Sequence, residues 1–281
     1  EEVPFAIIAL GEDPNCSDPQ GVRFSGGVTV NTQGGGIGTN ACVGVNGAAG
    51  EGEIDGQIEA HGTIDDRIVN FNPSGYMSEN QGIIPDPYAD FVADSPHPTE
   101  SADCQTVDPE IEESGGGGNR TWTLQPGTYT SATNLSPGGN VRNIVLEPGV
   151  YCFETPLTVN SNNTNIDASS GVLMYLASPN GDFEPGNANY EITTIGEEWA
   201  DIAIWSDNCD DDLNMHGNGE MQVTGVIYAP CTTLELGGTS GTDVLNGQVV
   251  ARDVWFHGNV EFNIDAGLEY TADPLRVFLV E

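Results

Sequence analysis

Two stretches of this chain, Arg120–Tyr129 (RTWTLQPGTY) and Arg142–Tyr151 (RNIVLEPGVY), repeat one pattern. Arg, Leu, Pro, Gly and Tyr occupy the same offsets in both stretches, and the second follows the first at an interval of about 22 residues. The interval returns further along, where Cys231 follows Cys209 by the same spacing. A fixed period of about 20–50 residues is typical of architectures that stack one structural unit on the next.

Each repeat consists of short β-branched runs separated by Gly, Pro and Asn, without a helical period. This composition favours the coils of a β-solenoid over helical repeats. We therefore predict an all-β chain folded as a right-handed parallel β-helix, with about 22 residues per coil in the clearest repeats. A long irregular loop on the flank and apolar strands at both ends of the chain complete the prediction.

Breaks in the pattern divide the chain into five segments. Residues 66–118 are acidic and rich in Pro and Gly, as in Pro85-Asp-Pro87, so we expect a loop packed on the outside of the solenoid. The segments are 1–12 (an apolar linking strand), 13–65 (narrow N-terminal coils), 66–118 (the loop), 119–270 (the main coils) and 271–281 (a C-terminal strand).

The formal net charge is -37, from 43 Asp and Glu against 6 Arg and no Lys. Such a charge repels phosphate backbones, so nucleic acid is excluded as a partner. A solvated secreted surface and specific calcium binding both explain the acidity. The chain opens with Glu1, and no run reaches the roughly 20 apolar residues of a membrane span. We therefore expect a mature form without a membrane partner, whose targeting or membrane segment lay upstream.

The six cysteines are expected to form three disulfides. Six cysteines allow fifteen connectivities, but the repeat narrows the choice. Cysteines one coil apart lie about 4.8 Å from each other, within the usual Cα–Cα range of about 4.4–6.8 Å, which predicts the pair Cys209–Cys231. Two further pairs follow as a local N-terminal loop and by elimination: Cys16–Cys42 and Cys104–Cys152. Full pairing predicts a secreted or cell-surface location.

An acidic cluster surrounds Cys209 and gathers hard oxygen ligands, which calcium prefers. The cluster is Asp207, Asp210, Asp211 and Asp212. It lacks the spacing of an EF-hand loop, so a solvated acidic corner is the alternative to a calcium site. No other cofactor is predicted.

Catalytic motifs are absent from the sequence, and we predict that the protein is not an enzyme. Each of the four histidines precedes Gly or Pro and is expected in an exposed turn: His61, His97, His216 and His257. Arg120 and Arg142 fall on successive coils, where a β-helix lyase could use basic residues against an acidic sugar, but ion pairs with the many acids are expected instead. Three sequons are candidates for glycosylation, at Asn119, Asn134 and Asn162.

Two apolar runs near the chain termini suggest a mode of assembly. The ends of a β-helix expose unpaired N–H and C=O groups, which invite pairing with another strand. A terminal strand placed along a neighbour's edge would join copies head to tail by β-augmentation, and such contacts build filaments. The residues expected to form these strands are Val3, Phe5, Ile7, Ile8 and Leu10, and Val277, Phe278, Leu279 and Val280. Alternatively, both strands fold back on their own chain.

Several short motifs together resemble the secreted portion of TadG-like proteins, which are associated with Tad/Flp pilus assembly. The motifs are Val3-Pro-Phe-Ala-Ile-Ile-Ala-Leu10, Cys16 with Cys42, Pro85-Asp-Pro87, Leu146-x-Pro-Gly-x-Tyr151-Cys152, Gly171-Val-Leu-Met-Tyr175, Gly225-Val-Ile-Tyr-Ala-Pro230 and Gly247-Gln-Val-Val-Ala251. The resemblance implies a surface role without known catalysis and a membrane helix upstream. Because that helix is absent here, a released and polymerised form is expected.

These observations favour a non-catalytic subunit of an extracellular filament, with the chain itself as its partner. The first alternative is a monomeric adhesin that binds surface or matrix glycans through aromatics such as Trp255 and Tyr88. The second is a β-helix polysaccharide lyase or hydrolase, whose activity would depend on Arg142 or Asp210.

Overall fold

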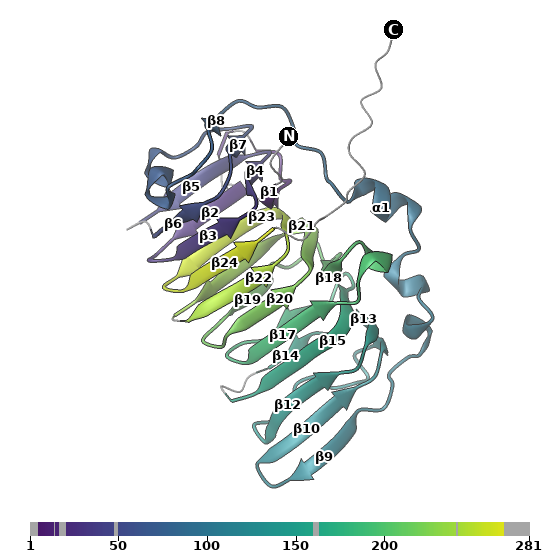
Figure 1. Cartoon of the computed structure of the whole chain (residues 1–281). Coiled ribbons are helices and arrows are strands. Elements are labelled where there is room, and N and C mark those ends of the chain that lie inside the picture. Colours follow the sequence, from purple (N-terminus) through teal and green to yellow (C-terminus); the bar gives the residue numbers. More distant parts are fainter. Residues whose placement is uncertain are drawn as a thin grey trace.

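The computed structural model describes residues 5–13, 15–16, 21–47, 50–159, 163–239 and 241–266. The chain forms a parallel β-solenoid of about 11 turns with roughly 22 residues per turn, which confirms the predicted fold class (Figure 1). Its strands form three ladders that run along the solenoid axis. We call them the strap face, the polar face and the third face.

The strap face is made of short strands that are largely buried on both sides. It contains β1 (Phe5–Ala9), β4 (Gly36–Thr39), β7 (Ile58–Ala60), β8 (Met77–Ser78), β11 (Gly127–Tyr129), β13 (Gly149–Phe153) and β18 (Ile202–Ser206). Three long strands pass from one face to another: β15 (Asn165–Leu176), β21 (Val226–Gly238) and β23 (Val249–Gly258).

Most strands of the polar face alternate buried and outward residues. It contains β3 (Thr29–Gln33), β6 (Glu51–Ile54), β9 (Glu112–Gly116), β10 (Asn119–Leu124), β12 (Val141–Leu146), β17 (Asn189–Thr194), β20 (Met221–Thr224), β22 (Thr242–Asn246) and β24 (Glu261–Asp265). The third face contains β2 (Gly21–Ser25), β5 (Cys42–Asn46), β14 (Leu157–Thr158), β16 (Phe183–Glu184) and β19 (Leu213–Gly217). The short helices are η1 (Asp66–Phe71), α1 (Ala89–Asp94), η2 (Pro98–Glu100), η3 (Asp103–Gln105) and η4 (Glu197–Trp199).

The spatial order of the coils differs from their order in the sequence. β1 lies in the interior of the stack, between β23 and β4, with Ile7 opposite both Val249 and Ile37. β2 and β3 likewise pair with β23 and β24 on one side and with β5 and β6 on the other. The first coils build toward one end, residues 79–111 cross to the opposite end, and β9–β24 return to meet β1–β3 (Figure 1). We call residues 79–111 the strap.

The ladder register sets the period of the repeat. Leu124 lies opposite Leu146, and Ile227 lies opposite Val249, so each residue faces its counterpart one full period later in the sequence. The register changes at some corners. Leu124 faces Leu146, but Tyr129 faces Phe153 and not Tyr151, its counterpart in the sequence repeat.

The repeated Pro-Gly-x-Tyr pattern builds one of these corners. The Tyr129 hydroxyl donates to the Gln125 carbonyl at 2.8 Å, and the Tyr151 hydroxyl donates to the Glu147 carbonyl at 2.6 Å. Each buried ring therefore binds the backbone of its own corner four residues earlier. Successive corners also touch, because a Cβ on Gly149 would lie 2.4 Å from Cγ of Pro126.

The strap covers the strap face, in the place expected for the loop of residues 66–118. A second hydrophobic cluster, separate from the solenoid core, joins strap residues such as Tyr88 to Leu173, Trp205 and Val250. The strands below it, β13 and β18, are buried at every position. Burial on both faces explains their continuous apolar sequences, which are typical of covered parallel sheets.

A buried carboxylate in the core gives a pH-dependent prediction. Asp243 of β22 is 6% exposed and accepts a hydrogen bond from the Met221 N–H at 2.8 Å. Burial raises its pKa from 3.8 to about 6. Because the folded pKa lies above the unfolded value, the stability linked to this proton is complete below pH 3.8 and is lost as the pH rises through about 6.

Asp243→Asn keeps an acceptor for Met221 and removes the buried charge. We expect it to raise the free energy of unfolding by about 2 kcal/mol at pH 7, and to have little effect at pH 4, in urea titrations. Glu191→Gln on β17, where the side chain is exposed, is the control for general charge repulsion. An equal gain at both pH values would rule out titration of Asp243 as the cause.

Candidate functional site

The three predicted disulfides are confirmed. Cys209–Cys231 joins neighbouring coils with a Cα–Cα distance of 5.1 Å, and Cys16–Cys42 has a distance of 5.6 Å. Cys104–Cys152 joins the strap to β13 with a distance of 5.8 Å. Such bonds are typical of proteins from oxidising compartments.

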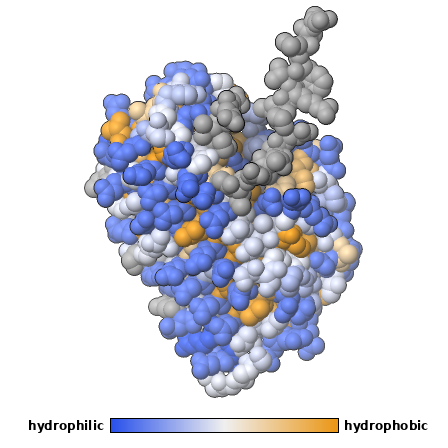
Figure 2. All heavy atoms as spheres, viewed as in Figure 1, coloured by the Kyte–Doolittle hydropathy of each residue, from blue (hydrophilic) through white to orange (hydrophobic). Residues whose placement is uncertain are grey.

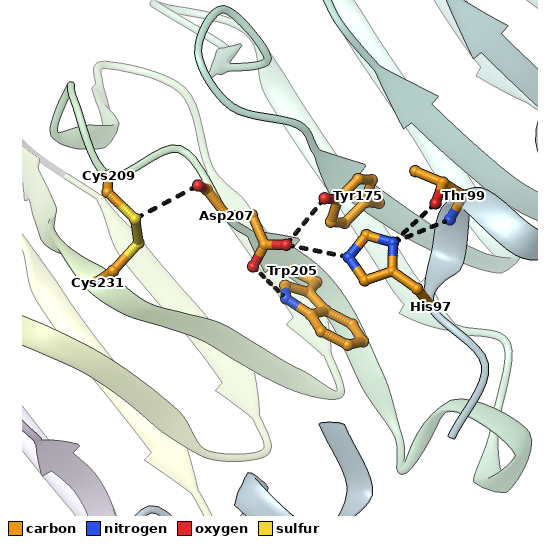
Figure 3. A network of polar contacts seen from close by, with 7 residues as sticks. All are labelled: His97, Thr99, Tyr175, Trp205, Asp207, Cys209 and Cys231. Atoms are coloured by element: carbon orange, nitrogen blue, oxygen red, sulfur yellow. Dashed lines mark hydrogen bonds and ion pairs between the residues drawn. A yellow bond between two sulfur atoms is a disulfide. The ribbon is translucent and has the colours of Figure 1, made fainter. Parts of the chain in front are cut away.

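A polar network beside Cys209–Cys231 anchors the strap (Figure 3). The Asp207 carboxylate accepts hydrogen bonds from the Tyr175 hydroxyl at 2.8 Å and from the Trp205 indole N–H at 2.9 Å. His97 of the strap reaches the same carboxylate through Nε2 at 3.2 Å. The other ring nitrogen of His97 contacts Thr99 and caps η2.

The network contains an Asp–His–hydroxyl sequence of contacts, which hydrolases also use. Here the Asp207 carboxylate also accepts hydrogen bonds from two aromatic side chains of the sheet. Thr99 is only two residues from His97, and the contact between them caps η2. These contacts support a role in holding the strap against the sheet.

The predicted calcium cluster is not brought together. Asp207 turns toward the strap, as described above. Within the described parts of the chain, no three His, Cys, Asp or Glu side chains lie close enough to hold a metal ion. The four aspartates therefore do not form a ligand set in this structure.

Arg120 and Arg142 each have a local partner. A bulge shifts the register between β10 and β12, so Arg120 lies opposite Val141 and not Arg142. Arg120 contacts Glu113 at 3.4 Å, and Arg142 Nε donates to the Gly118 carbonyl at 3.1 Å. The ion pair expected for Arg120 is therefore formed.

The prediction that all four histidines lie in exposed turns is wrong, because only His216 is exposed and it lies on a strand. His97 belongs to the strap network, whereas His216 of β19 and His257 of β23 lie two coils apart with ring centroids 5.7 Å apart. Gly237 lies between them, and a Cβ there would meet the His257 ring at 2.4 Å. Burial, with His216 and Arg23 nearby, lowers the pKa of His257. His216 and His257 are separated in the sequence by nearly two coil lengths, and this spacing could have predicted their contact.

The aromatic residues proposed for glycan binding are engaged in the fold. Tyr88 of the strap is fully buried and packs on Tyr228 of β21, with ring centroids 5.3 Å apart. The guanidinium of Arg23 lies 3.8 Å from the centroid of the Trp255 ring, and the Trp255 indole N–H donates to Ser25. Of the three candidate glycosylation sites, Asn119 and Asn134 are exposed. Asn162 lies outside the described residues.

The expected N-terminal linking strand is integrated in its own solenoid. Phe5, Ile7 and Ile8 belong to β1, whose edges both pair within the chain, and Leu10 continues this strand by donating to the Ala251 carbonyl at 2.8 Å. The structure thus differs from the expectation of a free terminal strand at an open end. Val3, Val277, Phe278, Leu279 and Val280 lie outside the described residues.

The two ends of the stack differ in chemistry. At one end the polar face finishes on β9, which is exposed at every position and carries Glu112 and Glu113. At the other end the strap face finishes on β8, which pairs with β7 on one side only among the described strands. We call residues 76–83, which contain β8, the edge segment.

The edge segment concentrates exposed apolar side chains. Tyr76 is 58% exposed, Met77 44% and Ile83 49%. Sequence reasoning missed this site because residues 66–118 were interpreted as one irregular loop. The short apolar pair Tyr76-Met77 between Gly and Ser is the only local signal of a strand.

The fold defines a strapped parallel β-solenoid, with the exposed strand β9 at one end and the edge segment at the other. The chain matches the family described as Domain of unknown function (DUF7305) over residues 93–271 and belongs to that family. The match covers most of the strap and the returning coils, whereas β1–β8 lie outside it. No curated protein and no solved structure matches the chain. None of the described helices is long and apolar enough to cross a membrane.

Proposed function

We propose that this protein is a non-catalytic structural subunit of an extracellular filament, in which a strand of one copy adds to the edge segment of the next. The observation that carries the proposal is the edge of β8, which pairs with β7 alone among the described strands, together with the exposed side chains of Met77 and Ile83 in the edge segment. Unpaired edges with apolar side chains are templates for strand addition.

The backbone of the edge segment is available for such pairing. The Tyr76 carbonyl accepts from the Ile58 N–H of β7 at 2.9 Å. Because hydrogen-bonding groups alternate along a strand, the N–H and C=O of Met77 point to the opposite side. An added strand would pair there and cover the apolar side chains.

The C-terminal run is the better donor of the two candidates. Withdrawing β1 would break two ladders and expose Ile7, which is fully buried. The run Leu275-Arg-Val-Phe-Leu-Val280 is apolar apart from Arg276. That cation, one of only six, complements the acidic Glu59 and Glu79 near the edge segment.

The contrast between the ends gives the assembly a direction. The acidic β9 end would repel a second β9 end, so copies add in one orientation. A head-to-tail contact of this kind does not close on itself and produces a filament. Three disulfides support an extracellular setting for it.

The test compares two substitutions that place the same charge on an exposed apolar residue. We expect the full chain to form filaments in electron microscopy and Met77→Glu to abolish them, because a charge on an edge strand blocks strand addition. Val92→Glu, on α1 of the strap, is the control and should polymerise normally. Thermal melting verifies that each variant is folded.

Mixing two inactive variants sharpens the test. A chain without residues 275–280 keeps the acceptor edge, whereas Met77→Glu keeps the donor run. Neither should form filaments alone, and an equimolar mixture should give dimers in analytical ultracentrifugation. Filaments from either variant, or a mixture that stays monomeric, would overturn the proposal.

A further inference from the structure

A hollow of about 960 Å³ lies on the polar face, where the returning coils meet the first coils. Strands β22, β24, β3 and β6 form its floor, and Asn72 and Ser74, which follow η1, line it from the side. This hollow is separate from the edge segment. Figure 2 shows that hydrophilic residues dominate much of the surface in this view.

An ordered row of side chains crosses the floor. Val244, Asn263, Asn31 and Glu53 stand opposite one another on successive strands, and the last three carry hydrogen-bonding groups. The Asn31 amide donates to Asn263 Oδ1 at 2.9 Å, and Asn31 Oδ1 accepts from the Glu53 N–H at 3.1 Å. These bonds fix the orientation of the amides before any ligand arrives, which lowers the entropy cost of binding.

The charge of the lining limits the ligand class. Glu51, Glu53, Asp55 and Asp265 contribute carboxylates, whereas the described residues that line the hollow include no Arg or His. Uronic acids and sulfated sugars would be repelled. Neutral and amino sugars can instead satisfy amide and carboxylate groups through their hydroxyl and ammonium groups.

The geometry also favours an extended ligand. Side chains in one row recur at the coil spacing of about 4.8 Å, so Asn263 and Asn31 present amide groups at successive steps along the axis. A chain of repeating sugars can meet such a row with successive hydroxyl groups. We propose that the hollow binds an extended glycan built of neutral or amino sugars, independently of polymerisation.

The solenoid offers a matched pair of positions for testing this site. Val244 and Val145 belong to the same outward row of the polar face, connected through Asp167, Glu191 and Gln222. Both are half-buried valines, but only Val244 lines the hollow. Val244→Trp therefore fills the hollow, whereas Val145→Trp places the same bulk outside it.

Isothermal titration calorimetry with cellohexaose, a chitosan hexamer and an oligogalacturonate hexamer tests the site. We expect at least one of the first two to bind, and Val244→Trp to weaken that binding at least tenfold while Val145→Trp leaves it unchanged. The double variant Asn31→Ala with Asn263→Ala should also lose binding, with Asn143→Ala and Asn165→Ala as its control on the lower coils.

The alternative outcomes are equally clear. Binding of neither the neutral nor the amino hexamer by the intact chain would overturn the proposal. So would preferential binding of oligogalacturonate, or an equal loss in the variants inside and outside the hollow. Circular dichroism and melting verify that the variants keep the fold.

Discussion

Replacing Cys104 and Cys152 together by alanine is expected to lower the free energy of unfolding by about 4 kcal/mol. This bond closes a loop of 48 residues, the longest of the three, and ties the strap to β13. Its loss enlarges the set of unfolded conformations and weakens the attachment of the strap. Urea titration of the oxidised protein measures the change.

Hydrogen exchange locates the same effect in the molecule. We expect faster exchange across the strap, because Tyr88 of the strap packs in the same apolar cluster as both cysteines of this disulfide. The bond between Cys209 and Cys231 closes only 22 residues, so its double replacement should cost about 3 kcal/mol without faster exchange in the strap. Equal exchange in both variants would show that the strap does not depend on Cys104–Cys152.

Ile7→Ala is expected to destabilise the protein by about 3 kcal/mol, because it opens a cavity in the centre of the stack. Ile7 is fully buried and lies between Val249 and Ile37. Leu10→Ala, just beyond β1 and only partly buried, is the control and should cost about 1 kcal/mol. Chemical denaturation of both variants gives the comparison.

The Ile7 variant also separates two roles for the N-terminal strand. A loss of about 3 kcal/mol in the free energy of unfolding agrees with a strand that completes its own solenoid. A negligible cost would mean that β1 is not seated between β23 and β4 in solution. The strand would then be free to link copies, and the C-terminal run would lose its advantage as donor.

Much of the fold could be predicted because a coil is a local unit. The pair Cys209–Cys231 follows from the period of the repeat, and the two Pro-Gly-x-Tyr corners form the same hydrogen bond from tyrosine to backbone. The contact between His216 and His257 depends on two coils and a glycine between them, so single motifs did not indicate it. The edge segment was hidden because β8 is so short, spanning only Met77–Ser78.

The hollow on the polar face could not be inferred from the sequence for a different reason. Asn31 and Asn263 are separated by 232 residues, yet their side chains are hydrogen-bonded. No period links them, because the strap interrupts the succession of coils between them. Only the closure of the stack brings the two amides together.

The sequence by itself determined the coil: its length, its corners, its inward residues and the disulfides between neighbouring turns. It did not determine the order of the coils. Every coil presents the same backbone hydrogen-bonding groups, so the repeat pattern does not specify which coil lies next to which. The tertiary structure decided that order by pairing β23 and β24 with β1, β2 and β3. The strap is long enough to allow this order. Residues 79–111 can extend by roughly 3.3 Å each. They can therefore span a stack of about 11 turns at about 4.8 Å per turn.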